Sequence, residues 1–596
     1  LDNGRAALLL TTADPTEDYI HTELVAENLA AGPHTMTIIA DRGWDQWALK
    51  GFSVGYQPYK RPYQTTMALL IGAAIISAIA TIYVARQANW QATSVGRIGR
   101  GLKQSQERLI AISLAILIAL TGWLTWGAQA AGVYRRLDDT VQFALVAGSA
   151  AIFYITPWLF VYLAALLCFF LFVYARPSWG VTIIAFSLPF YVPQLLKPIY
   201  VYRFSPVEIF TLVTFAAVVL ATITQWRQEI NTQGLDAFRQ QLSGKLSNYD
   251  AAVGLFFTVA TLSLLFTERL DVATNEWRLV ILEPILLYVI IRLIKPRSAE
   301  LWRILDGFVL GGVAVALIGL WQYATGSNLI EAEAGLMRLR SIYGSPNNVA
   351  LYLGRVLPLL VAMFLMGQAT NQTRRWLYSA AAVPVSLAIL LSFSKGALLL
   401  GVPMMLLFLF VFWQHKNERR IWPWLATAAI LAVVGYVAAL QIPQLAGRLD
   451  LTSDTGVFRL NLWRSSLNMI REHPWFGVGL DNFLYAYRGR YILAEAWQEP
   501  NLNHPHNLVL DFATRLGILG LLSGLFLFGL TFKALWHAYK RQTAAWQPAV
   551  LGFAGAMVHT ITHGIVDHSF FLVDLAFAFF LIFTIAIQLE KTTTSD

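Results

Sequence analysis

Residues 66–84 read TMALLIGAAIISAIATIYV and contain no charged side chain. A helix over such a run is long enough to cross a hydrocarbon core of about 30 Å, since an α-helix rises about 1.5 Å per residue. Similar apolar runs recur along almost the whole chain of 596 residues, of which 57% are hydrophobic and only 13% charged. An ordinary soluble protein has about 25% charged residues. The sequence therefore predicts an all-α polytopic membrane protein with about 14–15 transmembrane helices.

Composition also limits the chemistry that this chain can carry out. Its single cysteine, Cys168, lies inside an apolar run, which excludes a disulfide framework, a cysteine-based zinc site and a thiol redox pair. The net charge of +9 would favour a nucleic-acid partner in a soluble protein. Here, however, lysine and arginine fall mostly in the short loops between apolar runs, which is the pattern that sets membrane topology. We expect membrane lipid, and no nucleic acid, as a partner.

The basic loops predict which side of the membrane each connection faces. The loop after the first crossing is basic and carries Arg86, Arg97, Arg100, Lys103 and Arg108 against a single Glu107, which predicts a cytoplasmic location. Residues 1–65 and the long loop 442–507 are then external, as are shorter connections near residues 268–278, 323–345, 394–396 and 567. We expect a multi-pass membrane protein with its functional site on the external side.

Three regions are predicted along the chain. Residues 1–65 form an external β-rich segment, because residues 32–41 and 51–56 alternate polar and apolar side chains. This segment resembles a truncated β-sandwich of the carbohydrate-binding kind, with a simple anchor or spacer as the alternative. Residues 66–130 form a two-helix membrane extension, and residues 131–596 form the main transmembrane domain. Because the sequence begins at Leu1 and not at a methionine, we expect it to be part of a longer chain.

The number of membrane crossings, odd or even, is hardest to predict in the apolar stretch 141–174. This stretch is too long for one crossing and is interrupted at Pro157. We predict one full crossing at about 158–175, preceded by a half-helix or an interfacial segment.

The external loop 442–507 contains polar and aromatic residues that the packing of membrane helices does not require. Arg459 and Trp463 occur in its middle, and its end reads Asn503-His504-Pro505-His506-Asn507 directly before an apolar helix. A histidine at this point lies at the membrane–water boundary, where the head group of a lipid-linked substrate is found. His506 is therefore a candidate for chemistry on such a substrate.

Four segments in a fixed order carry a family resemblance. The first three are Arg338-Leu-Arg340 leading to Pro346-Asn347, then Ser394-Lys395-Gly396, then Arg459-x3-Trp463 with Pro474-Trp-Phe-Gly477. The fourth is His506-Asn507, followed after nine residues by Gly517-Ile-Leu-Gly520. Over about residues 180–588 the chain resembles the O-antigen ligase and Wzy-type polysaccharide polymerase superfamily. One departure is Lys395, where the family usually has arginine, so that the charge is kept but the bidentate fork is lost.

The resemblance implies a membrane glycosyltransferase. Such enzymes move a glycan from a polyprenyl-diphosphate carrier to a sugar hydroxyl on the external face of the bacterial inner membrane, without a nucleotide sugar, a metal or another cofactor. Arginines suit the diphosphate, because their planar fork binds phosphate oxygens bidentately. The implied diphosphate-binding residues are Arg338 and Arg459, with Arg340 and Lys395 as secondary candidates. Arg338 is preferred over Arg340 because its spacing in the sequence from Pro346-Asn347 fits the family pattern better.

His506 is the candidate general base, because the acceptor hydroxyl must lose a proton and an imidazole titrates near neutral pH. Direct displacement of the diphosphate would invert the anomeric centre. The residues expected to support the site are Asn507, His504, Asn347, Trp463, His563 and Asp567. For His506 the alternative is a helix cap, although Asn507 is itself a good capping residue.

Other polar groups have a structural explanation beside a functional one. His559, His563 and Asp567 are spaced four apart on one helix face, as metal ligands would be. The resemblance covers His563 and Asp567 without a metal, so we predict a polar ladder that supports the site. The i, i+4 pair of Asp511 and Arg515 is expected to be a structural ion pair, and Glu283 the partner of a nearby arginine. Gly517 and Gly520 are expected to allow close helix packing.

Two other classes of function are compatible with this sequence. A flippase or transporter of lipid-linked glycans would bind diphosphate with the same arginines but would need no base. It usually has inverted repeats, which we do not find. A scaffold protein acting through its N-terminal segment would leave the external motifs unexplained. Within the leading hypothesis, the sequence does not separate a ligase, a polymerase and a protein-glycosylating enzyme.

Overall fold

A computed structural model describes residue 72 and residues 129–192, 196–199, 202–233, 247–331, 335–416, 454–497 and 499–591. The chain forms two compact units, Leu1–Thr37 with Leu137–Asp596, and Ile38–Arg136. The predicted N-terminal strands and nearly all of the two-helix extension lie outside the described residues. The candidate site residues all belong to the first unit.

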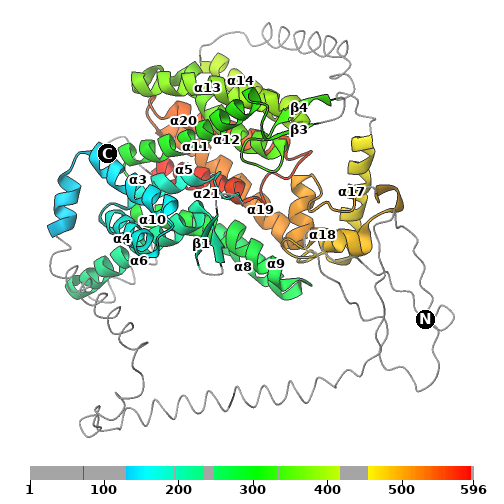
Figure 1. The fold of residues 1–596 in the computed structure, drawn as a ribbon, viewed down its shortest axis with the longest axis horizontal. Coiled ribbons are helices and arrows are strands. Elements are labelled where there is room, and N and C mark those ends of the chain that lie inside the picture. Colours follow the sequence, from blue (N-terminus) through cyan, green and yellow to red (C-terminus); the bar gives the residue numbers. More distant parts are fainter. Residues whose placement is uncertain are drawn as a thin grey trace. The chain divides into compact units, whose positions relative to one another are not determined.

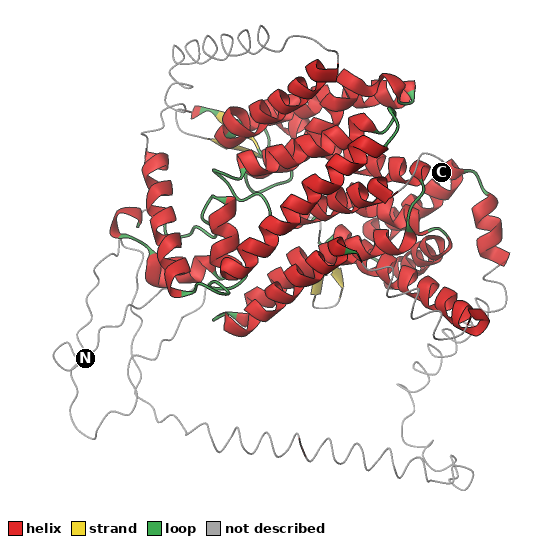
Figure 2. Ribbon diagram, turned by 180° about the vertical axis from the view of Figure 1, so that it is seen from behind, coloured by secondary structure: helices red, strands yellow, loops and turns green. Residues whose placement is uncertain are grey.

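The described part of the first unit is an assembly of apolar helices (Figures 1 and 2). Eight of its helices are long and apolar enough to cross a membrane. They are α6 (Pro206–Gln233), α8 (Asn248–Ser263), α11 (Ser298–Ala324), α12 (Pro346–Met366), α13 (Gln372–Ser392), α14 (Val402–Lys416) with the π-helix η7 (Ala397–Gly401), α19 (Leu508–Arg541) and α21 (Val573–Lys591). This confirms the predicted all-α polytopic membrane protein. The number of crossings in the whole chain stays a prediction, because residues 417–453 and most of 1–128 lie outside the described residues.

Shorter elements connect these helices. They are α5 (Pro177–Ser187), α9 (Leu270–Glu276), α10 (Glu283–Ile294) and α20 (Gln547–His563), the 3-10 helices η3 (Leu264–Phe266) and η6 (Gly367–Ala369), the π-helix η4 (Trp277–Leu282), and two antiparallel hairpins, β1 (Lys197–Ile199) with β2 (Tyr202–Phe204) and β3 (Leu329–Glu331) with β4 (Met337–Leu339). In the second hairpin Ile330 is opposite Arg338.

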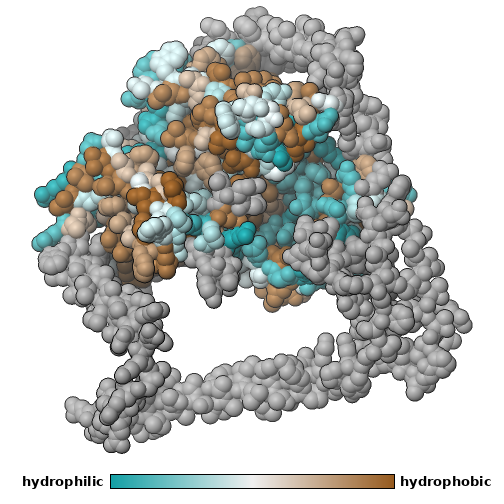
Figure 3. Space-filling view, in the orientation of Figure 1, coloured by the Kyte–Doolittle hydropathy of each residue, from teal (hydrophilic) through white to brown (hydrophobic). Residues whose placement is uncertain are grey.

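The distribution of apolar side chains fits a lipid environment. α21 lies at the centre and nearly all of its residues are buried. Large apolar side chains on outer helices are exposed, among them Phe160 and Val383, and apolar residues cover much of the surface seen in Figure 3. In water such a surface would cost free energy at about 25 cal/mol per Å², so these helix faces are suited to lipid.

The apolar stretch 141–174 forms two helices, α3 (Asp139–Ile155) and α4 (Leu159–Ala175), which pack against each other. α4 has the predicted bounds. α3 is longer than the predicted half-helix, because Asp138 caps its start by accepting from the backbone of Thr140 and the apolar run then continues for 17 residues. Pro157 explains the break, since the residue before a proline is disfavoured in helical conformation.

Two of the arginines in the described helical assembly form ion pairs with buried carboxylates. Arg515 contacts Asp511 at 2.7 Å and Glu276 at 2.5 Å, which joins α19 to α9. Arg278 contacts Glu283 at 2.9 Å. Both interpretations from the sequence, an ion pair within α19 and an arginine partner for Glu283, are confirmed.

Much of the predicted external loop 442–507 folds as a helical unit, which we call the loop unit (residues 454–503). It contains α17 (Asp454–Glu472), α18 (Phe483–Ala486), the π-helix η8 (Tyr487–Tyr491) and the 3-10 helix η9 (Ala494–Ala496). Its own apolar core is formed by Leu462, Met469, Val478, Phe483, Tyr487, Tyr491, Ile492 and Ala496. Packing of this kind gives the loop unit a defined shape, so side chains on α17 have fixed positions relative to α19.

Candidate active site

His506 lies immediately before α19 in a backbone conformation with φ 49°. The cap of α19 is supplied by its neighbour, because Asn507 Oδ1 accepts hydrogen bonds from the backbone of Val509 and Leu510, both at 3.0 Å. Asn507 Nδ2 also donates to the carbonyl of Ile565 at 3.0 Å. Capping is thus completed without His506, and its imidazole is available for other contacts.

The imidazole of His506 is paired with a buried carboxylate. His506 Nδ1 lies 3.0 Å from Oδ1 of Asp567, in the turn that follows α20. The Asp567 side chain is 2% exposed, whereas that of His506 is 22% exposed. The pairing holds the Nδ1 edge of the imidazole against the protein, while part of the ring stays accessible to solvent.

Two further histidines complete a cluster around Asp567 Oδ1. His568 contacts it through its backbone N–H at 2.9 Å and through Nδ1 at 3.1 Å. His504 Nε2 lies 3.7 Å from the same oxygen and 3.1 Å from His506 Nδ1. We call His504, His506, Asp567 and His568 the histidine cluster. Three of its members were predicted from the sequence. His568 was assigned no role there, and its position next to Asp567 was the available signal.

The hydrogen bonds define which nitrogen of each ring carries the proton. His504 Nδ1 lies 2.6 Å from Asn503 Oδ1, which can only accept, so His504 Nδ1 carries hydrogen and Nε2 of the neutral ring has a lone pair. That lone pair faces His506 Nδ1, which must then be the donor, shared with Asp567. A neutral His506 therefore has its basic lone pair on Nε2.

Electrostatics within the cluster favour an ionised carboxylate and neutral His504. Burial by itself would raise the pKa of Asp567, but the hydrogen bonds from His506 and His568 outweigh it and hold that pKa well below its ordinary value. Burial, together with the charges of His568 and His506, lowers the pKa of His504 well below its ordinary value.

The glycines of the predicted signature connect α19 to the loop unit. Gly517 has φ 69° and ψ −169°, which breaks α19, and a Cβ there would lie 2.2 Å from the backbone of Trp475. The freed N–H of Ile518 donates to the carbonyl of Pro474 at 2.7 Å, and Val478 N–H donates to Thr514 at 2.7 Å. The expected role of Gly517 in helix–helix packing is wrong in this detail, because the segment that approaches it is the turn at residues 474–476.

α17 brings two predicted residues to the same region. Trp463 Nε1 donates to the carbonyl of Pro505, between the two loop histidines, at 2.9 Å. Arg459 lies one turn earlier on α17, is half-buried, and its positive charge acts on His563. Arg459 is thus within electrostatic range of the C-terminal end of α20.

Arg338 is fixed by two contacts at the start of α12. Its Nε donates to the carbonyl of Ser392 at 2.9 Å, and its Nη2 donates to Asn347 Oδ1 at 3.0 Å. Arg340 instead donates to the carbonyl of Asn328 at 3.3 Å. The contacts distinguish the two arginines, since only Arg338 is tied to Asn347 and to the turn that contains Lys395.

Helix packing places these residues at the same end of the assembly as the histidine cluster. α12 and α20 are antiparallel neighbours, because Gly354 packs on His559 while Leu359 packs on Gly552. Asn347 at the start of α12 therefore lies at the end of α20 that precedes Asp567. Gly396, next to Lys395, packs directly on the ring of His563.

The predicted ladder along α20 is formed only in part. His563 Nε2 lies 3.9 Å from Asp567 Oδ2, which is a contact but no short hydrogen bond. Both nitrogens of His559 and of His563 are buried without a hydrogen-bond partner among the described residues. The set His559, His563 and Asp567 is therefore not assembled as metal ligands, and the carboxylate belongs to the histidine cluster instead.

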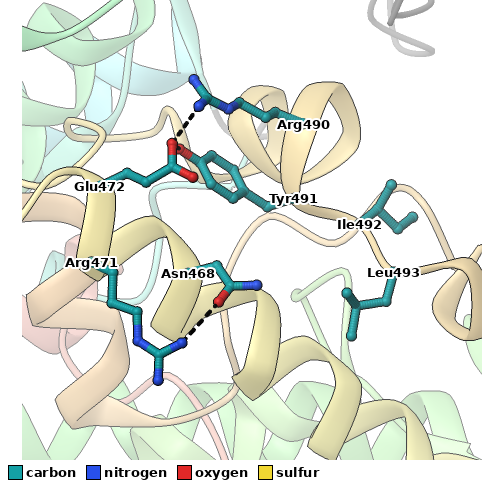
Figure 4. A pocket seen from close by; sticks show the side chains of 7 residues that line it. All are labelled: Asn468, Arg471, Glu472, Arg490, Tyr491, Ile492 and Leu493. Atoms are coloured by element: carbon teal, nitrogen blue, oxygen red, sulfur yellow. Dashed lines mark hydrogen bonds and ion pairs between the residues drawn. The ribbon is translucent and has the colours of Figure 1, made fainter.

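A separate polar hollow of about 250 Å³ lies in the loop unit, at the far end of α17 (Figure 4). Glu472 contacts Arg490 at 2.5 Å and Tyr491 at 2.9 Å, and Arg471 contacts Asn468 at 3.4 Å. Arg471 is about 18 Å along the helix axis from Arg459, at 1.5 Å per residue. No pattern in the sequence indicated this hollow, because its lining comes from α17 and from η8 with the residues after it.

Comparison with known proteins supports the family predicted from the motifs. Residues 380–525 match the family described as O-Antigen ligase. A stretch of 148 residues is 29% identical to the O-antigen ligase of Pseudomonas aeruginosa and covers 25% of this chain and 31% of that protein. A stretch of 305 residues is 26% identical to the general O-oligosaccharyltransferase of Acinetobacter baylyi and covers 47% of this chain and 50% of that protein. The matched regions thus span about a third and a half of these two relatives.

The family match contains Lys395, Arg459, Trp463, His506 and Asn507, while Arg338 and Asp567 lie outside it. Its bounds also enclose the loop unit and the first part of α19, including the break at Gly517. Residues 380–525 are thus similar to the O-antigen ligase family, in agreement with the resemblance carried by the sequence motifs.

Proposed function

We propose that this protein transfers a glycan from a polyprenyl-diphosphate carrier to an acceptor hydroxyl at the external face of the bacterial inner membrane. The observation that carries the proposal is the pairing of His506 Nδ1 with Asp567, which leaves Nε2 as a basic nitrogen. The family match and the two relatives support transfer of a glycan by a membrane protein.

The reaction is a direct displacement. His506 Nε2 takes the proton of the acceptor hydroxyl while the acceptor oxygen forms a bond to the anomeric carbon of the donor. The bond from that carbon to the diphosphate oxygen breaks, and its electron pair leaves with the carrier diphosphate. Attack opposite the leaving group inverts the anomeric centre. Asp567 orients the ring and stabilises the imidazolium that forms, which such pairs do in other enzymes with a histidine base.

Cationic side chains are proposed to bind the diphosphate. The leaving group gains negative charge as the glycosidic bond breaks, so fixed positive charges nearby lower the barrier. Arg459 and Arg338 are the principal candidates, and both are half-buried. Arg338 is held by Ser392 and Asn347, and Arg459 lies one turn before Trp463, which donates to Pro505 beside the histidine cluster. Lys395 and Arg340 are the secondary ones. No metal ion is needed for this step.

The acceptor defines the type of enzyme. A lipid-linked core sugar makes the enzyme a ligase, the end of a second glycan makes it a polymerase, and a serine or threonine hydroxyl makes it a protein oligosaccharyltransferase. One relative is named a ligase and the other an oligosaccharyltransferase. All three acceptors present a hydroxyl, so the same base serves each of them.

The first test distinguishes transfer from transport. The full chain is reconstituted in vesicles with a fluorescent polyprenyl-diphosphate glycan, an acceptor of each kind and a chelator. Transfer of label to an acceptor, with loss of the carrier-linked form, is expected. Movement of labelled donor between leaflets without any product would overturn the proposal and favour the flippase.

A further inference from the structure

The four side chains of the histidine cluster have the spacing of a metal-binding site. His504 Nε2, His506 Nδ1, Asp567 Oδ1 and His568 Nδ1 all lie within 4.8 Å of one another. Four of the distances between them are 3.0, 3.1, 3.1 and 3.7 Å. Zinc bound tetrahedrally at 2.0–2.1 Å has ligands about 3.3 Å apart. Small movements of these side chains would therefore bring all four to one ion.

The backbone holds the two parts of this site together. His504 and His506 precede α19, whereas Asp567 and His568 follow α20. The two segments are joined by the hydrogen bond from Leu508 N–H to the carbonyl of Gly564 at 2.6 Å and by the bond from Asn507 to Ile565. Because the segments are already paired, little chain ordering is required when a metal binds.

The donor set favours zinc or a similar transition metal. Three imidazoles and one carboxylate match borderline ions such as Zn²⁺, Co²⁺ and Ni²⁺, whereas Mg²⁺ and Ca²⁺ prefer oxygen ligands. His504 already presents the lone pair of Nε2 to the cluster, because Asn503 accepts the hydrogen of its Nδ1. Asn503 would also fix this ring in the metal complex, as outer-shell partners of metal-binding histidines do.

We propose that the histidine cluster binds one Zn²⁺ ion and that this ion reversibly inhibits glycan transfer. The inhibition, but not the binding, rests on the proposed function. When the ion binds Nδ1 of His506, the single hydrogen of the neutral ring moves to Nε2. The nitrogen that takes the acceptor proton then becomes an N–H donor, so the base is lost without any change in the number of protons on the ring.

Metal binding is tested first without reference to activity. The full chain is purified without a polyhistidine tag, treated with a chelator, and titrated with ZnCl₂ by calorimetry and with CoCl₂ by absorption spectroscopy. One ion per chain, with the intense visible bands of tetrahedral cobalt, is expected. Binding of neither ion, or six-coordinate cobalt held only by water and carboxylate, would overturn the site.

Variants identify the ligands. His568→Asn and His504→Gln should each weaken zinc binding by at least about tenfold. His415→Gln, which changes an exposed histidine at the end of α14, should not. If His568→Asn fails to fold, His504→Gln together with the zinc X-ray absorption spectrum of the parent decides the question. Equal zinc affinity of the parent and both cluster variants would overturn the ligand assignment.

Inhibition is measured separately on the parent. Transfer should fall by more than tenfold once zinc saturates the calorimetric site, and should return on addition of EDTA. If zinc binds tightly and transfer is unaffected, the inhibitory role is overturned, whereas the assignment of the zinc-binding site stands. Zinc binding by a parent that never forms product would instead count against the proposed function.

Discussion

His506 Nδ1 lies 3.0 Å from Oδ1 of Asp567, although 61 positions separate the two residues in the chain. The contact orients the ring so that Nε2, rather than Nδ1, carries the basic lone pair. It also joins the segment before α19 to the turn after α20. The pair of His506 and Asp567 thus depends on the packing of α19 against α20 and at the same time orients the base that we propose.

Asp567→Asn should lower the transfer rate while the affinity for donor stays within about twofold. The amide can donate a hydrogen bond, which favours a lone pair on His506 Nδ1 and hence the wrong tautomer. A loss of about 10²–10⁴ in kcat is expected, the usual contribution of a positioned base. Steady-state rates with varied donor measure this, and a variant with unchanged kcat would show that Asp567 does not orient the base.

Arg459→Ala should impair use of the donor more than that of the acceptor. Removing the guanidinium leaves the diphosphate without one fixed cation, and the loss in kcat/KM for donor should be about 10²-fold. Arg459→Lys should recover part of it, because charge returns without the bidentate fork. The matched control is Arg464→Ala, an exposed arginine on the same helix. Equal effects of both alanine variants would contradict a specific role for Arg459.

The two neighbouring arginines before α12 should differ. Arg338→Ala removes contacts to Ser392 and Asn347, whereas Arg340→Ala removes one to Asn328 at 3.3 Å. We expect at least a tenfold larger loss of kcat/KM for Arg338→Ala, because only Arg338 is fixed beside the turn with Lys395. The opposite order of activities would reverse the assignment made from the spacing to Pro346.

Gly517→Ala should destabilise the fold. Alanine at φ 69° and ψ −169° is strained by about 1–3 kcal/mol, because essentially only glycine adopts this conformation, and its Cβ would collide with the backbone of Trp475. Thermal unfolding in detergent should show a lower midpoint. Gly529→Ala on the same helix is the control, because nothing lies within 4 Å of a Cβ there and alanine favours helix by about 1 kcal/mol. Similar midpoints for both variants would contradict the close approach of residues 474–475 to α19.

Chelation should not reduce transfer by the purified protein. The displacement that we propose uses His506 and fixed cations, so EDTA is expected to leave the rate unchanged or to raise it when zinc is present. Rates before and after dialysis against EDTA measure this. A loss of activity that zinc or magnesium restores would show that an ion takes part in catalysis.

Local signals in the sequence were sufficient for some parts of the structure. Long apolar runs predicted the membrane helices, and the i, i+4 spacing predicted the pair of Asp511 and Arg515. Asn507 was recognised as a good capping residue, which is a local property of the residue and its place before α19. These features depend on neighbours within a few residues.

Other parts depend on contacts between distant segments. His506 pairs with Asp567, and His568 joins them, only because α19 and α20 lie side by side. The hydrophobic periodicity of the sequence carries no information on which helices are neighbours. The break at Gly517 arises because residues 474–475 of the loop unit press against α19. The polar hollow beside Glu472 likewise exists only after α17 and η8 have packed together. Long-range packing of this kind cannot be predicted from local pattern.

The role of His506 as the base is decided by single-turnover transfer with His506→Ala, with donor binding measured on the same preparation. We predict that the variant binds polyprenyl-diphosphate glycan as the parent does but forms product at least about 10²-fold more slowly. His473→Ala, which changes another histidine of the loop unit, is the control. Product formation at the parental rate by His506→Ala would contradict the claim that His506 is the base.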